Sequence, residues 1–144
     1  MEGDKLATLS RVDIQKIEKY WIDHEHNKRQ LKFREWELIH PFSEADSNIG
    51  GGKSNRISNT TEQKALALSE DKLYQNLKQI VNVIEDLYQE LDNDSKTIVD
   101  MRYWCKSDFY EWEDIADKLF MSRHKVLRKR NLLIDETAKR IGWV

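Results

Sequence analysis

A short basic block near the C-terminus is the strongest chemical signal in this sequence. Between Arg123 and Arg130 there are five basic residues, one histidine and no acid. Residues 95–144 carry a net charge of +3, whereas residues 1–94 carry −5, so the positive charge is concentrated at one end of the chain. A local basic block on a mildly acidic chain indicates a confined contact with a polyanion.

The residues just before and inside this block have the spacing of a helix-turn-helix. Ile115 and Leu119 are four residues apart and are expected to face a core, with the small Ala116 where a second helix must approach closely. Ser122 can cap that second helix through its hydroxyl, and Val126 is the next core position. A major groove admits one helix, which a preceding helix must brace, so the pattern predicts a unit that binds double-stranded DNA.

On a helical wheel, the last predicted helix has an apolar side and a basic side. Lys125 and Arg128 are one turn apart on the basic side, placed to reach guanine or phosphate. Arg123 is expected to hold a phosphate beside the helix N-terminus. Arg130 falls within the apolar stripe, so we expect it to extend along the surface or pair with an acid. The predicted DNA-binding residues of this segment are Ser122, Arg123, His124, Lys125, Arg128 and Lys129.

The turn and the start of the first helix depart from the usual pattern. Many such motifs have glycine in the turn, where this chain has Phe120, so we expect a turn that needs no positive φ angle. The first helix has no hydroxyl residue immediately before Trp112, and Asp108 is the expected alternative cap. The competing interpretation of the whole segment is a solvated basic helix end in an ordinary bundle.

Composition places these residues in a helical protein. The 144 residues are enough for one or two small domains. Charged residues make up 35% and apolar residues 39%, with only five glycines and one proline, which favours helices over a β-sandwich or a Gly-rich α/β nucleotide fold. No apolar run approaches the roughly 20 residues that span a membrane, and the N-terminus has no apolar h-region. Cys105 is the only cysteine, which excludes an internal disulfide, so we expect a cytoplasmic protein of a bacterial host.

Two long helices are predicted before the basic segment. Residues 10–40 form one helix, with Ser10 as a candidate N-cap and Pro41 as its end. A second helix starts near Thr61 and carries a heptad seam of nearly three heptads. The seam is interpreted either as the buried face of a bundle helix or as a surface for self-association. Its residues are Leu73, Leu77, Ile80, Ile84, Leu87 and Leu91.

The predicted organisation is all-α, with long N-terminal helices joined by a Gly/Ser/Asn-rich loop to a C-terminal helix-turn-helix domain. Lys53 and Arg56 lie in that loop, which is interpreted as a flexible linker or as an arm that touches the DNA backbone. Further helices are expected over residues 95–104 and from Arg123 to Ile141. The predicted segments are 1–44 (N-terminal helix), 45–61 (loop), 62–92 (oligomerisation helix) and 93–144 (DNA-binding domain).

The C-terminal part resembles region 4 of sigma-70-type factors. The similar runs are Arg102-Tyr-Trp, Trp112-Glu-Asp-Ile-Ala-Asp-Lys-Leu and Ser122-Arg-His-Lys-Val. The whole chain resembles the RinA-type phage transcriptional activators, through the run Asp46-Ser-Asn-Ile-Gly-Gly-Gly-Lys-Ser-Asn-Arg-Ile-Ser and the closing residues 138–143 as well. That resemblance implies a late-gene regulator of a phage or prophage, which binds a promoter region and activates packaging and structural genes. Bacterial RNA polymerase is a second candidate partner beside promoter DNA.

Other chemistry has weaker support in the sequence. Gly50-Gly51-Gly52-Lys53-Ser54 resembles the end of a phosphate-binding loop, but Ser47 stands where the first glycine is needed and no apolar strand precedes it. His24 and His26 are two residues apart and cannot share one face of a helix, so we expect no metal site. No arrangement of nucleophile and base is evident. We therefore expect no enzyme, no catalytic residue and no cofactor, with a nucleotide-binding enzyme as the distant alternative.

Two further expectations concern assembly and packaging. A single recognition helix reads few base pairs, so specific binding in a genome usually needs two or more copies, and we expect a homo-oligomer held by residues 10–92. The nearest alternative function is that of a phage small terminase subunit, which also joins a helix-turn-helix to an oligomerising helical region. Such subunits more often carry the DNA-binding part at the N-terminus, whereas here it is predicted at the C-terminus.

Overall fold

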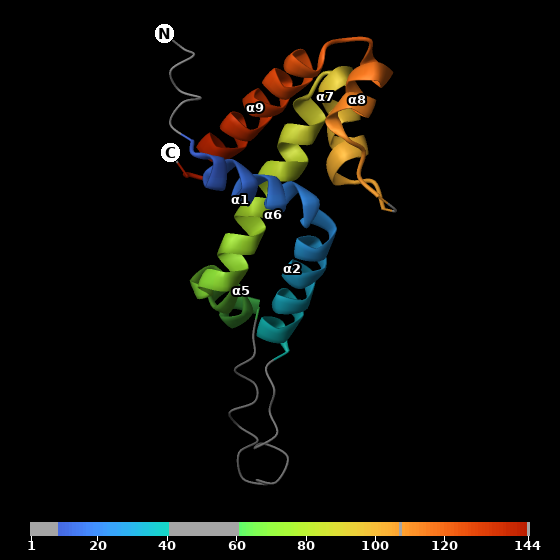
Figure 1. The fold of residues 1–144 in the computed structure, drawn as a ribbon. Coiled ribbons are helices and arrows are strands. Elements are labelled where there is room, and N and C mark those ends of the chain that lie inside the picture. Colours follow the sequence, from blue (N-terminus) through green and yellow to red (C-terminus); the bar gives the residue numbers. More distant parts are fainter. Residues whose placement is uncertain (1–8, 41–60, 107, 144) are drawn as a thin grey trace, which may run out of the picture. The chain divides into compact units, whose positions relative to one another are not determined.

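The computed structural model describes residues 9–40, 61–106 and 108–143, and the regular elements within these ranges are all helices (Figure 1). No strand occurs in the described part, so the all-α prediction is confirmed. The segment predicted as a Gly/Ser/Asn-rich loop, with Lys53 and Arg56, lies outside the described residues except for Thr61. The helices are α1 (Arg11–Ile22), α2 (His24–Ile39), α5 (Thr61–Glu70), α6 (Lys72–Glu90), α7 (Asn93–Ile98), the π-helical turn η3 (Val99–Tyr103), α8 (Trp112–Leu119) and α9 (Arg123–Arg140).

The chain divides into two compact units. Unit 1 comprises Met1–Glu25 and Ile80–Val144, and unit 2 comprises His26–Gln79. Helix α1 therefore belongs to the same compact unit as the predicted DNA-binding segment, whereas residues 26–40 of the predicted N-terminal helix belong to unit 2.

The predicted helix over residues 10–40 is interrupted at Asp23, which separates α1 from α2. Ser10 does cap α1: its hydroxyl accepts the Asp13 amide at 3.1 Å, and the Asp13 carboxylate accepts the Ser10 amide in return. At the break, the Trp104 indole donates a hydrogen bond to the Trp21 carbonyl at 2.7 Å. An indole partner from a distant part of the chain thus satisfies a carbonyl at the end of α1, where the ladder of helical hydrogen bonds stops.

The second predicted helix is also two helices, α5 and α6, separated by Asp71. The Asp71 carboxylate accepts the Tyr74 amide at 2.8 Å and so caps α6. Arg34 donates two further hydrogen bonds to the same carboxylate, at 3.0 and 2.6 Å. These hydrogen bonds, that from Arg34 above all, hold the pKa of Asp71 below its ordinary range. The residue at the break therefore also links α2 to the start of α6 within unit 2, through the ion pair between Arg34 and Asp71.

Three of the six residues of the predicted heptad seam are buried inside unit 1. Ile80, Ile84 and Leu87 belong to one core with residues of α1 and α9, whereas Leu73, at the start of the seam and in unit 2, is 54% exposed. The bundle-face interpretation therefore holds for the C-terminal part of the seam. The main core consists of Leu9, Ile17, Trp21, Ile80, Ile84, Leu87, Val99, Tyr103, Leu133, Ile134 and Ala138.

A second core cluster supports the C-terminal helices of unit 1. It begins at α7, which Asp92 caps by accepting the Ser95 amide at 2.8 Å. The helix then widens into η3, a π-helical turn that brings Tyr103 into the main core and leaves Ile98 in the second one. The second cluster consists of Ile98, Trp112, Ile115, Ala116 and Val126. Helix α9 consequently packs on α7, on α8 and on α1.

Candidate nucleic-acid interface

Helices α8 and α9 form the predicted helix-turn-helix pair. Ile115 of α8 and Val126 of α9 are fully buried in the second core cluster, and Ala116 in the same cluster is 5% exposed. The Ser122 hydroxyl accepts the Lys125 amide at 3.1 Å, which confirms the predicted cap of α9. The pair is therefore held by the positions that the sequence pattern indicated.

The turn between the helices is built differently from the prediction. Phe120 has φ 56° and ψ 45°, so the left-handed residue typical of this turn is present without glycine. Its side chain is 94% exposed. The expectation of a turn without positive φ is therefore wrong, because the Met121 amide must return to the Ala116 carbonyl, at 3.1 Å, to close the end of α8. Asp108 is not the N-cap of α8 either: Glu111 occupies that position and makes no side-chain capping bond.

Three predicted DNA-binding residues lie exposed on the outer face of α9. His124, Lys125 and Arg128 are all solvent-exposed, on the side opposite the buried Val126. Arg128 Nη2 lies 3.1 Å from His124 Nε2. No acid forms an ion pair with Lys125 or Arg128 among the described residues. This outer face, defined by His124, Lys125 and Arg128, therefore presents positive charge directly to solvent.

Two other predicted residues, Arg123 and Lys129, are engaged by acids from neighbouring elements. Arg123 Nε lies 3.0 Å from the Glu113 carboxylate of α8. Lys129 Nζ lies 3.2 Å from the carboxylate of Asp92, the cap of α7. The Asp92 pKa is lowered, first by its hydrogen bond from the Ser95 amide and also by Lys129. The sequence did not predict either ion pair. Glu113 and Asp92 belong to elements other than α9, so their proximity to Arg123 and Lys129 depends on how the helices pack.

Arg130 faces inward, as the helical wheel predicted. Its guanidinium donates to the Glu18 carboxylate of α1 at 2.8 Å, and it lies over the Trp112 ring with 5.2 Å to the centroid. The Tyr103 hydroxyl donates to the same carboxylate, and burial together with Glu18 raises the pKa of Tyr103. Arg130 therefore ties α9 to α1 and η3 and does not belong to the outer face.

A scan against protein families finds a match over residues 14–139, with a family described as proteins of unknown function. The chain belongs to the DUF722 family. No curated protein and no solved structure matches it. The match runs from within α1 through almost all of α9, so a single family model of this DUF722 protein spans both the N-terminal helices and the α8–α9 pair.

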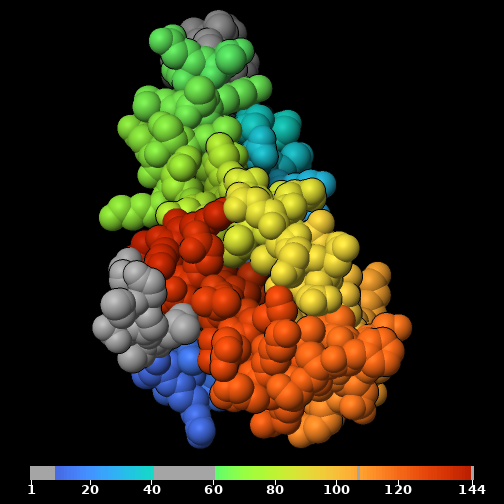
Figure 2. Space-filling model, turned by 90° about the horizontal axis from the view of Figure 1, so that it is seen from above, coloured from blue at the N-terminus to red at the C-terminus, as the bar shows by residue number. Residues whose placement is uncertain are grey.

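The exposed side of α9 in this DUF722 protein lies beside α7 and α8. Figure 2 shows that face of unit 1, with α9 in orange-red to red, α8 in orange and α7 in yellow. The segment that leads into α8 is held by Arg102, whose packing role did not follow from its place in the Arg102-Tyr-Trp run. Arg102 lies over both the Phe109 ring, at 4.5 Å, and the Trp112 ring, at 4.4 Å, and donates to the Tyr110 carbonyl at 2.9 Å. Arg102 therefore fixes the approach to α8 from η3.

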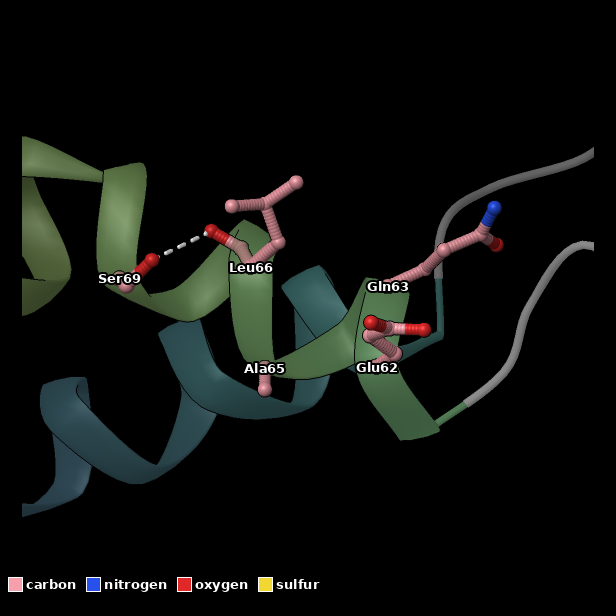
Figure 3. A pocket seen from close by; sticks show the side chains of 5 residues that line it. All are labelled: Glu62, Gln63, Ala65, Leu66 and Ser69. Atoms are coloured by element: carbon pink, nitrogen blue, oxygen red, sulfur yellow. Dashed lines mark hydrogen bonds between the residues drawn. The ribbon is translucent and has the colours of Figure 1, made fainter.

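Elsewhere in the DUF722 chain, the described residues offer little for small-ligand chemistry. In unit 2, a surface hollow of about 500 Å³ is lined by one face of α5, and the Ser69 hydroxyl there donates to the Leu66 carbonyl at 2.9 Å (Figure 3). No group of three or more His, Cys, Asp or Glu side chains within residues 9–40, 61–106 and 108–143 is placed to hold a metal ion. In the same ranges, no helix is both long and apolar enough to cross a lipid bilayer. The hollow is lined by Glu62, Gln63, Ala65, Leu66 and Ser69.

Proposed function

We propose that this DUF722 protein is a sequence-specific regulator that binds double-stranded DNA and activates late genes of a phage or prophage. The observation that supports it most is the outer face of α9. His124, Lys125 and Arg128 lie within the first two turns of a helix that α8 braces, and that end of a recognition helix is the one that contacts base edges. An ordinary solvated helix end would not require the brace, the serine cap and the exposed cations together.

The finer assignment depends on resemblance. The Gly-rich run, the Arg102-Tyr-Trp block and the helix-turn-helix occur in the same order as in RinA-type activators, which act on packaging and structural genes. Under this proposal Lys125 and Arg128 contact guanine or phosphate, Ser122 and Arg123 contact the backbone, and Lys53 and Arg56 add backbone contacts from the loop. Under the same proposal, RNA polymerase is the second partner of the DNA-bound protein.

A selection of genomic fragments tests this proposal. The full-length protein is incubated with sheared DNA of the encoding phage or prophage, and bound fragments are sequenced and footprinted. We expect enrichment upstream of packaging and structural genes, and increased transcription from those promoters with purified polymerase. Enrichment at a packaging initiation site, with no effect on transcription, would instead support the terminase alternative. Enrichment without any sequence preference would contradict both.

We propose further that the active species is a homo-oligomer, because one recognition helix reads only a few base pairs. Ile80 and Ile84 cannot test this, because they lie in the core of unit 1 and their replacement by aspartate would unfold it. Exposed apolar residues of unit 2 are better targets, in particular Trp36 and Leu73, which are 56% and 54% exposed. Light scattering of Trp36→Lys and Leu73→Lys should show loss of assembly, and a monomeric wild type at DNA-binding concentrations would contradict the proposal.

A further inference from the structure

Two ion pairs beside the outer face of α9 involve Arg123 and Lys129, which the sequence predicted as DNA-binding residues. Successive residues of an α-helix are about 100° apart, so Arg123 and Lys129 flank the sector that holds His124, Lys125 and Arg128. Arg123 is paired with Glu113 of α8, and Lys129 with Asp92 before α7. Both flanks of the positive surface therefore carry a carboxylate supplied by another element.

We propose that Glu113 and Asp92 are intramolecular competitors of DNA phosphate. In the free protein each carboxylate occupies a cation that would otherwise bind the DNA backbone, and the two together lower the affinity of α9 for any duplex. This inference rests on the proposed function and deepens it. It assigns to Glu113 and Asp92 the control of the sequence-independent part of DNA affinity.

The exposure of the pairs supports exchange with phosphate. The side chains of Arg123 and Glu113 are 53% and 67% exposed, and those of Lys129 and Asp92 are 22% and 60% exposed. Exposed ion pairs contribute little to folding, so a phosphate can replace the carboxylate without disturbing α9. The pair of Arg130 and Glu18 is different: its side chains are only 17% and 15% exposed, and it cannot open without disrupting the core.

The same geometry predicts which property changes. Phosphate contacts supply most of non-specific binding and part of specific binding, whereas base contacts supply the preference for one sequence. Removing Glu113 or the charge of Asp92 should therefore tighten binding to random and target duplexes by the same factor. The ratio of the two affinities should stay as in the wild type. Variants of Lys125 and Arg128 should change that ratio.

The test uses full-length protein and fluorescence anisotropy with a random-sequence duplex at low salt. Glu113→Gln and Asp92→Asn should each tighten binding about two- to fivefold, the range expected for an exposed ion pair. Asparagine keeps an oxygen that can accept the Ser95 amide, so the cap of α7 is retained. The matched control is Glu90→Gln, which removes an acid paired with Arg140 at the other end of α9 and should leave the affinity close to that of the wild type.

A double-mutant cycle separates competition from a change in net charge. In an Arg123→Gln background, Glu113→Gln should lose most of its effect, because the cation that it releases is absent. Equal affinities of Glu113→Gln, Asp92→Asn and Glu90→Gln would overturn the inference, as would an effect of Glu113→Gln that is independent of Arg123. A wild type that binds no duplex would refute the proposed function itself, whereas duplex binding without these differences would refute only the inference.

Discussion

The two halves of α9 have opposite surroundings although they are continuous in one helix. The C-terminal half is packed from several sides: Ile134, Thr137 and Ala138 are fully buried, and the Thr137 hydroxyl accepts the Trp21 indole of α1 at 3.0 Å. The N-terminal half has one fully buried residue, Val126, with Leu127 partly buried beside the second core cluster, and its exposed side chains are His124, Lys125 and Arg128 together with Arg123. The C-terminal half therefore anchors α9 in unit 1, and under the proposed function the N-terminal half is the part that contacts DNA.

The largest expected effect is on the anchoring half. Ile134→Ala removes a fully buried side chain from the main core and should lower the free energy of unfolding by about 2–5 kcal/mol. Leu132→Ala is the matched control, because Leu132 lies on the same helix but is 56% exposed, and its change should stay within about 0.5 kcal/mol. Urea denaturation followed by circular dichroism measures both, and equal losses would contradict the division of α9 into two halves.

On the binding half, Lys125→Ala and Arg128→Ala should act on DNA and leave stability unchanged. Each lost base contact should weaken binding to the target duplex by about 1–3 kcal/mol, because both side chains are exposed and contribute nothing to the core. Anisotropy with target and random duplexes gives the affinities, and a melting curve verifies folding. If both variants bind the target as the wild type does, the assignment of the recognition face is wrong.

The turn that separates α8 from the binding half should be improved by glycine. Phe120 adopts a left-handed conformation with its side chain 94% exposed, so the ring makes little contribution to the core while the backbone is strained. Phe120→Gly should raise the free energy of unfolding by about 1 kcal/mol. Gly142→Ala, at φ 80° after the other end of α9, should lower it by a similar amount, although its Cβ would meet no neighbour. A destabilised Phe120→Gly would show that the ring has a structural role.

The smallest expected effect is a dependence of stability on pH. The pKa of Asp92 is lowered in the folded protein from its ordinary 3.8, first by the Ser95 amide. Its contribution is therefore present above pH 3.8 and is lost as the pH falls through the lowered pKa. Thermal unfolding between about pH 2 and 5 should show a smaller dependence for Asp92→Asn than for the wild type. Lys129→Gln should retain most of the pH dependence, because the Ser95 amide lowers the Asp92 pKa more than Lys129 does. An equal loss in both variants would show that Lys129 is the main cause.

Features that depend on neighbours in the sequence were predictable. The serine caps at Ser10 and Ser122 and the inward position of Arg130 follow from local spacing and the helical period, and the structure has all three. The breaks at Asp23 and Asp71 were not predictable from periodicity. The break at Asp71 combines a local cap, the Tyr74 amide, with a distant partner, Arg34, and at the break after α1 the partner is the distant Trp104.

The candidate site shows the same division. The exposure of Lys125 and Arg128 followed from the wheel, but the engagement of Lys129 by Asp92 joins residues 37 apart on separate elements. The left-handed conformation of Phe120 was not predicted either. The end of α8 requires a positive φ angle at this position, so that the Met121 amide reaches the Ala116 carbonyl, and this requirement overrides the preference of phenylalanine for negative φ. The sequence pattern therefore predicted the face of α9, and the structure is needed to show which cations on it are already occupied.

The most direct test of whether the outer face of α9 binds DNA is the salt dependence of duplex binding by the full-length protein. On duplex DNA each phosphate contact adds about 0.9 to the slope of the log–log plot of affinity against salt concentration. We predict a steep slope for the wild type, and a slope smaller by about 0.9 for Arg123→Gln, which removes a proposed phosphate contact. A slope near zero for the wild type would contradict the account, because the outer face of α9 would then bind a partner other than DNA.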